Sequence, residues 1–124
     1  MSAFGWVAFL IAGALGAQLR YVVTGVVGER TAGAFPWATL LINVTGSLVL
    51  GLLTGLALYH GLATTASTTL GVGFCGAYTT FSTFTFETVA LLEQGAVCEA
   101  LLAALGTLVA CAAAGALGMA VAAL

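Results

Sequence analysis

The small number of charged residues constrains this chain more than any other feature. It carries two arginines, no lysine and four acidic residues over 124 positions, and 62% of its residues are apolar. In soluble domains about a quarter of the residues are charged, because charged side chains cover the surface that faces water. The sequence therefore excludes a water-soluble globular enzyme and predicts a chain surrounded mainly by lipid. A net charge of -2 without a basic cluster also argues against a nucleic-acid partner.

Apolar runs separated by short polar breaks predict four membrane-spanning helices. A hydrocarbon core about 30 Å thick is crossed by about 20 helical residues, and four stretches of this chain reach that length. We expect these spans at about residues 4–27, 36–59, 62–92 and 96–124. The first run lacks the basic region of a signal peptide, so we interpret it as a retained span. Residues 1–124 are then expected to form a single all-α transmembrane domain.

The third span contains a segment that disfavours a regular helix. Gly71, Gly73 and Gly76 fall within six residues, and glycine has a poor helix propensity. Irregular backbone at membrane depth persists only where protein, water or an ion satisfies its polar groups. We therefore predict that the glycine-rich segment, residues 71–78, breaks the third helix.

Glycines and arginines both bear on how the helices assemble. Small residues such as Gly51 and Gly55 let helices approach closely in lipid, and packing within one chain or between chains explains them equally well. The turn expected at residues 28–33 contains Arg30 beside an acid. Because Arg20 and Arg30 lie near the same end of the first hairpin and the other turns carry no base, the positive-inside rule orients the chain only weakly. This pattern is compatible with an antiparallel pair of identical chains.

The sequence contains no motif typical of catalysis or of a metal site. It has no paired acids, no zinc-protease motif and no nucleophile motif, so we predict that the chain is not an enzyme. His60, beside Gly61, is interpreted as a turn residue in contact with water. Cys75, Cys98 and Cys111 lie in apolar segments without CxxC spacing. We interpret them as small helix residues and not as disulfide partners or zinc ligands.

Aromatic and hydroxyl residues alternate in the second half of the third span. Phe81 and Phe84 are three residues apart, which places their rings on one face of a helix. Thr80, Thr83 and Glu87 follow helical spacing on a neighbouring face. Hydroxyls inside a membrane need partners, and two interpretations stay open. The hydroxyls either line a polar pathway or bond to carbonyls one turn earlier in their own helix.

Three further polar residues lie inside predicted spans. Asn43 is in the middle of the second span, and its amide indicates either an interhelical hydrogen bond or contact with a solute. Thr39 lies one turn earlier on the same side. Arg20 and Glu87 are the charges most clearly within spans, and such groups are functional candidates that often pair with each other. The sequence does not decide whether they meet.

Three segments of the chain carry a resemblance to one family. Residues 73–84 read GFCGAYTTFSTF, and residues 13–21 and 39–47 agree with the first and second spans of the same pattern. Together they resemble the Fluc (CrcB) family of fluoride channels. The resemblance implies four transmembrane helices with a broken third helix, assembled as an antiparallel, dual-topology homodimer with two fluoride pores near the interface.

The resemblance also implies roles for single residues. Phe81 and Phe84 correspond to pore phenylalanines and Asn43 to a pore asparagine. The Gly76 and Thr79 carbonyls would hold a structural sodium ion at the dimer centre. Arg20 takes the family's first-helix arginine position and, with Glu87, is assigned a vestibular or structural role, while Ala103 departs from a tyrosine found in some relatives. The residues assigned to the fluoride pathway from both arguments are Asn43, Phe81, Phe84, Thr39, Thr80, Thr83 and Thr107.

The expected function is passive export of fluoride from the cytoplasm through the inner (plasma) membrane, which reduces fluoride toxicity. Two alternative functions stay open. Small proton-coupled multidrug exporters also have four spans but depend on a carboxylate in the first span, where this chain has only Gln18 and Arg20. A membrane assembly subunit that transports nothing would need only the glycine-rich helix faces.

Overall fold

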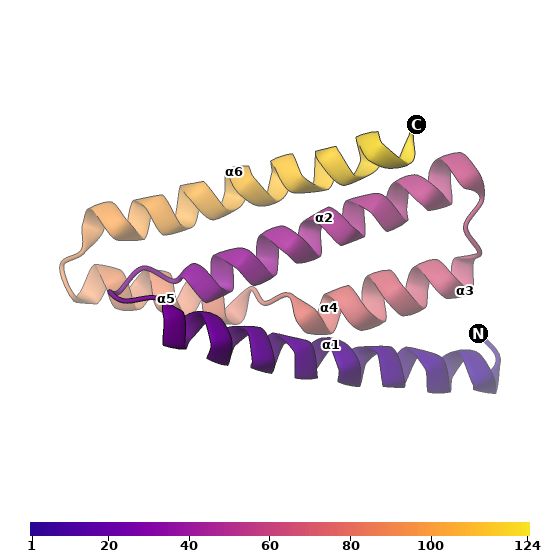
Figure 1. Cartoon of the computed structure of the whole chain (residues 1–124), viewed down its shortest axis with the longest axis horizontal. Helices are drawn as coiled ribbons and strands as arrows, with labels where there is room; N and C mark the ends of the chain where they lie inside the picture. Colours follow the sequence, from indigo (N-terminus) through magenta and orange to yellow (C-terminus); the bar gives the residue numbers. More distant parts are fainter.

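The structure is a computed structural model that describes residues 1–124, and every regular element in it is a helix. The prediction of an all-α chain is therefore confirmed. Figure 1 shows the chain running back and forth along the long axis, with both termini at the same end. The helices in chain order are α1 (Ala3–Arg30), α2 (Trp37–His60), α3 (Thr64–Ser67), the π-helix η1 (Thr68–Cys75), α4 (Gly76–Tyr78), α5 (Ser82–Glu93) and α6 (Val97–Ala122).

Three of these helices are long and apolar enough to cross a membrane. Helices α1, α2 and α6 have 28, 24 and 26 residues and mean hydropathies of 1.5, 1.9 and 2.1. At a rise of about 1.5 Å per residue, each is longer than the hydrocarbon core. Only 21 of 124 residues are buried within the chain, and large apolar side chains such as Phe86 and Leu108 are exposed. A surface of this kind requires apolar surroundings.

Capping residues explain where two of the long helices begin and end. Helix α1 starts after Ser2, whose Oγ accepts a hydrogen bond from the Gly5 amide at 3.1 Å. It continues to Arg30, three residues beyond the predicted span, so the expected turn at residues 28–33 is partly helical. A cation in the last helical turn interacts favourably with the helix dipole, which supports this extension. Helix α2 ends at Gly61, whose φ of 67° is readily adopted by glycine.

The glycine-rich segment does not interrupt the helix, contrary to the sequence-based expectation for residues 71–78. It lies in η1 and α4, and the first extended residue is Thr79, with φ −76° and ψ 163°. Helix α5 then begins at Ser82. The glycines permit close packing instead, because a Cβ on Gly73 would lie 3.1 Å from the Phe9 carbonyl oxygen of α1. The interruption, residues 79–81, therefore follows the glycine-rich segment and does not lie within it.

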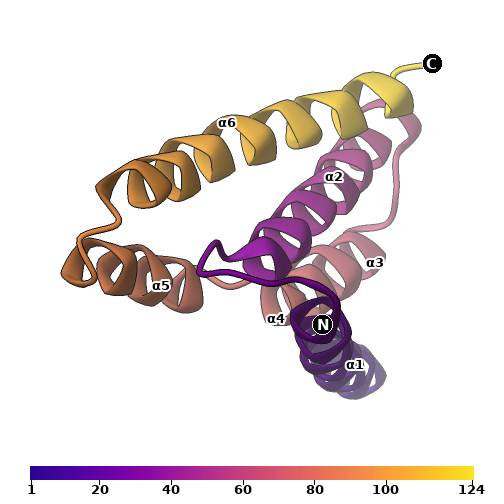
Figure 2. The same ribbon diagram turned by 60° about the vertical axis from the view of Figure 1, so that its left-hand side comes forward.

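Helices α2 and α6 pack along a seam of glycines and lie side by side in both ribbon views (Figures 1 and 2). A Cβ on Gly118 would lie 2.6 Å from the Leu52 amide nitrogen, and one on Gly51 would lie 2.8 Å from the Gly115 carbonyl carbon. These glycines are therefore used for packing within the chain. Figure 2 also shows α1 alongside α4, and α5 beneath the beginning of α6.

Candidate functional site

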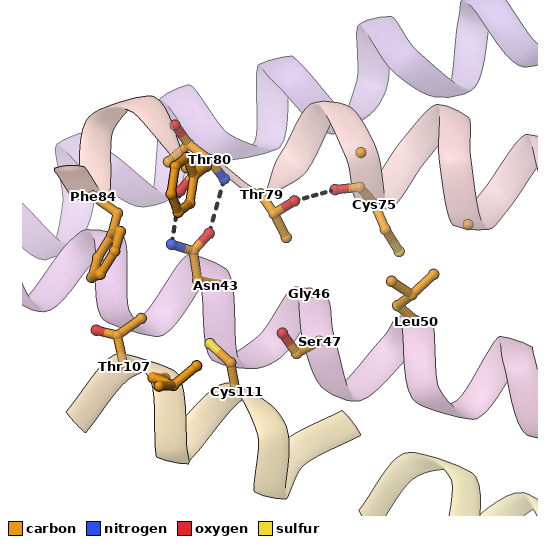
Figure 3. A pocket seen from close by; sticks show the side chains of 14 residues that line it. Asn43, Gly46, Ser47, Leu50, Cys75, Thr79, Thr80, Phe84, Thr107 and Cys111 are labelled. Carbon is orange, nitrogen blue, oxygen red and sulfur yellow. Dashed lines mark hydrogen bonds between the residues drawn. The ribbon is translucent and has the colours of Figure 1, made fainter. Parts of the chain in front are cut away.

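A cavity of about 350 Å³ lies between α2, α6 and the interruption that follows α4 (Figure 3). Helix α2 forms one wall, η1 and α4 form a second, and α6 contributes a third. Most of the lining is apolar, with a small set of polar groups near the interruption. The lining residues are Asn43, Gly46, Ser47, Leu50, Gly71, Cys75, Gly76, Thr79, Thr80, Phe81, Phe84, Thr107, Leu108 and Cys111.

The Asn43 side chain binds the backbone of Thr80 with both ends of its amide. Its Nδ2 donates to the Thr80 carbonyl at 2.9 Å, and its Oδ1 accepts from the Thr80 amide at 2.8 Å. Figure 3 shows both bonds bridging from α2 to the interruption. Both residues are buried. One Nδ2 hydrogen is left over, because the primary amide has two donors.

These bonds change the hydrogen bonding of the preceding helix. In a continuing α-helix the Thr80 amide would donate to the Gly76 carbonyl four residues earlier. Here it donates to Asn43 instead, so Gly76 loses its helical donor. The neighbouring Thr79 carbonyl accepts from Arg20 Nη1 at 3.2 Å. Gly76 and Thr79, the two residues expected to bind sodium, both line the cavity. Of their two carbonyls, that of Thr79 accepts the hydrogen bond from Arg20 of α1.

Phe81 and Phe84 lie together at the cavity, as their spacing predicted. Their ring centroids are 5.9 Å apart and the rings are tilted by 43°. Phe84 is partly buried, whereas 76% of the Phe81 surface is exposed within the single chain. The edges of aromatic rings carry partial positive charge. The pair therefore offers weakly electropositive edges beside the polar end of the cavity.

The hydroxyls of this region fall into two groups. Thr79 donates to the Cys75 carbonyl at 2.9 Å and Thr85 to the Phe81 carbonyl at 3.1 Å, so both are satisfied locally. Thr80 donates to the Thr83 hydroxyl at 2.9 Å. The proton of the Thr83 hydroxyl has no acceptor in the chain. The self-bonded interpretation therefore holds for Thr79 and Thr85. The polar pathway stays a prediction for Thr80 and Thr83.

Other predicted site residues lie apart from the cavity. Thr39 is buried but does not line it. Glu87 lines a second pocket, beside the turn between α1 and α2, and its Oε2 is shielded without a hydrogen-bond partner. Arg20 bonds to Thr79 and does not meet Glu87. Ala103 packs against Leu91 in an apolar cluster.

Several lining residues were not predicted from the sequence, although helical spacing could have found them. Ser47 lies one turn after Asn43 on α2, and Leu50 follows at nearly two turns. Cys111 lies one turn after Thr107 on α6. Thr107 itself is buried at the cavity, and its hydroxyl has no hydrogen bond within the chain.

Comparison with known proteins assigns the family. The sequence model of the family described as "CrcB-like protein, Camphor Resistance (CrcB)" matches residues 7–119. The chain belongs to the CrcB family. "Fluoride-specific ion channel FluC 1" of Leifsonia xyli subsp. xyli is 52% identical, over 80% of this chain and 72% of that protein. "Fluoride-specific ion channel FluC 1" of Streptomyces avermitilis is 53% identical, over 70% of this chain and 71% of that protein. "Fluoride-specific ion channel FluC" of Thermus thermophilus is 44% identical, over 79% of this chain and 78% of that protein.

Membership of the CrcB family confirms the resemblance found in the sequence. The relatives are named as ion channels, which agrees with the prediction that the chain is not an enzyme. Together with the three long apolar helices, the family identifies a multi-pass membrane protein.

Proposed function

We propose that this chain is a passive, fluoride-selective channel that lets the anion leave the cytoplasm across the inner (plasma) membrane. The names of its CrcB relatives support fluoride as the permeant ion. The single observation that carries the proposal is the convergence of Phe81, Phe84, Asn43 and Thr107 on one cavity.

The chemistry of the cavity suits a small anion. Fluoride is strongly hydrated, so a pore must replace its water with groups of positive polarity. The remaining Asn43 N–H, the Thr107 O–H and the edges of both phenylalanine rings are such groups. Other members of the proposed pathway and its vestibule are Thr39, Thr80, Thr83, Arg20 and Glu87.

The membrane potential supplies the driving force for export. Neutral hydrogen fluoride crosses membranes and dissociates in the more alkaline cytoplasm, which traps fluoride inside. An inside-negative potential contributes about 2.3 kcal/mol per 100 mV to each departing anion. Passive flow through a pore is therefore sufficient to lower the cytoplasmic concentration.

The proposed assembly is an antiparallel homodimer in which residues 62–92 act as one interrupted span. The cavity is open in the single chain, and a second copy would cover Phe81, its exposed lining residue. The Gly76 and Thr79 carbonyls would hold a sodium ion between the copies, where it supplies a fixed positive charge. Both residues fit this role, because carbonyl oxygens suit a hard cation and the Gly76 oxygen has lost its helical donor. Arg20 occupies only one of the two lone pairs of the Thr79 oxygen.

The proposal is tested with the double variant Phe81→Ile/Phe84→Ile. Isoleucine keeps the apolar volume but has no electropositive ring edge, so fluoride efflux from liposomes, followed with a fluoride electrode, should be lost. Phe86→Ile is the matched control, since Phe86 is on the same helix, 74% exposed and outside the cavity. Wild-type efflux of chloride should be absent. Unchanged fluoride efflux in the double variant would contradict the aromatic pathway, while proton-driven cation transport or silence in the wild type would favour the exporter or the assembly subunit.

A further inference from the structure

We propose that Asn43 is a positioning residue that holds the interruption at residues 79–81 open and keeps the Gly76 carbonyl free for a cation. This role differs from contact with the permeating anion. The inference rests on the sodium site of the proposed function. It explains why the backbone of Thr80 makes no helical hydrogen bonds.

Asn43 occupies both backbone polar groups of Thr80. The Thr80 amide and the Thr80 carbonyl are the groups through which a helix would continue from α4 into α5. Asn43 bonds both, at 2.8 Å and 2.9 Å, from a position 37 residues away. The amide side chain thus takes the place of two helical partners. A continuous helix through Thr80 and this pair of bonds exclude each other.

The helix ends on either side of the interruption are held by bonds other than those of Asn43. The Thr79 amide still donates to the Cys75 carbonyl at 2.9 Å, which completes the end of α4. The Thr83 amide donates to the Thr80 hydroxyl oxygen at 3.2 Å, which caps the beginning of α5. The backbone groups at the end of α4 and at the beginning of α5 therefore have hydrogen-bond partners nearby in the sequence. Only Asn43, from α2, satisfies the backbone of Thr80 itself, and buried backbone groups require a partner.

The bonds of Asn43 also affect the Gly76 carbonyl. Its expected donor is committed to Asn43, and Gly76 lines the cavity, while Ala77 and Tyr78 do not. A Cβ on Gly76 would meet nothing within 4 Å, so no other element packs against this residue on its Cβ side. A carbonyl oxygen without a donor, on a residue that lines a cavity, is suited to a cation. If Asn43 released the Thr80 amide, that amide would return to Gly76 and cap it.

The experiment reads the Gly76 carbonyl directly, by its ¹³C chemical shift in purified protein titrated with sodium chloride against choline chloride. In the wild type we expect a sodium-dependent shift. In Asn43→Leu, which has similar volume and no polar atoms, the signal should move to a hydrogen-bonded value and lose its sodium response. Thr54→Val is the matched control on the same helix, because the exposed Thr54 hydroxyl donates only to the Leu50 carbonyl. It should respond as the wild type does.

A rescue variant separates positioning from a general loss of structure. Thr80→Pro removes the amide that competes for Gly76, and Thr79 already has the extended conformation that a residue before proline prefers. The double variant Asn43→Leu/Thr80→Pro should therefore regain the sodium response that Asn43→Leu loses. Thr80→Pro alone should retain it, which keeps the inference testable if Asn43→Leu does not fold. A retained response in Asn43→Leu, or a lost response in Thr80→Pro, would overturn the inference.

Fluoride efflux measured on the same wild-type preparation distinguishes this inference from the channel function. Efflux without any sodium-dependent shift would leave the channel in place and overturn both the cation site and the role of Asn43. A sodium response with the expected pattern of variants, but without efflux, would support the role of Asn43 and overturn the channel.

Discussion

At the scale of single residues, Arg20 shows how a membrane-buried charge can be held without a carboxylate. Its guanidinium reaches from α1 to the Thr79 carbonyl at 3.2 Å, and no acid lies within bonding distance. The bond ties α1 to the first extended residue of the interruption. The charge itself is not neutralised, so Arg20 leaves a positive potential near the cavity, and such a potential attracts anions.

We expect Arg20→Gln to lower fluoride efflux by about tenfold or more without admitting chloride. A hydrogen bond to a charged group is worth about 1.5–3 kcal/mol, and its loss would loosen Thr79, whereas the ring edges proposed to contact the anion would stay in place. Efflux of each anion from liposomes measures both effects. Arg30→Gln is the control, because it removes the same charge from the exposed end of α1. Chloride permeation through Arg20→Gln would contradict this placement.

Chemistry and helical spacing singled out Asn43, Phe81 and Phe84, and the family resemblance singled out Thr107. Asn43, Phe81, Phe84 and Thr107 all line the cavity. Thr39 does not, although it lies one turn from Asn43, because along α2 the cavity begins at Asn43. Spacing gives the face of a helix but not the level at which a cavity starts or ends.

At the scale of elements, the interruption between α4 and α5 explains what local propensity misses. The glycines of residues 71–76 predicted the break, yet they lie in continuous helix, and of these Gly73 packs closely against α1. The extended residue Thr79 follows them, next to a bond from Asn43 on another helix. A partner that distant leaves no local signal, so only the region and not the position of the break could be predicted. Hydropathy, by contrast, found the long helices because their length and composition are local properties.

We expect Gly118→Ala to destabilise the fold by about 1–3 kcal/mol, the usual effect of overpacking. Its Cβ would lie 2.6 Å from the Leu52 amide nitrogen, and backbone atoms along the α2–α6 seam cannot move aside easily. Chemical unfolding in detergent measures the difference.

Gly106→Ala is the matched control on the same helix. A Cβ there meets nothing within 4 Å, so the better helix propensity of alanine should leave stability unchanged or raise it by up to about 1 kcal/mol. Equal destabilisation by both substitutions would show that the seam is not tightly packed.

At the scale of the whole molecule, the single chain has a small interior and an open cavity. Its few charges give the chain little preference for one orientation in the membrane, because Arg20 and Arg30 are its only Lys or Arg residues. An antiparallel partner would cover Phe81 and complete the cavity. The positions of the spans predict neither the pairing of two chains nor the antiparallel direction of that pairing. A hydropathy pattern is the same for both orientations of a chain in the membrane.

We therefore expect a tag placed after Leu124 to be accessible from both sides of the membrane in equal shares. Glu93→Arg/Gln94→Arg is the comparison, because it adds positive charge to the turn between α5 and α6, at the same end as the α1–α2 turn (Figure 1). This variant should place the tag mostly on the outer side. Selective modification of intact cells and of inverted vesicles measures the shares. A wild-type tag on one side only would exclude the antiparallel dimer.

The location of both termini at one end of the long axis limits how such a pair could be encoded in one polypeptide. If two copies were fused in tandem by a soluble tether, the second would begin on the side where the first finished, and the two would point the same way. A head-to-tail fusion that preserves opposite orientations would need a connector with one more crossing of the bilayer.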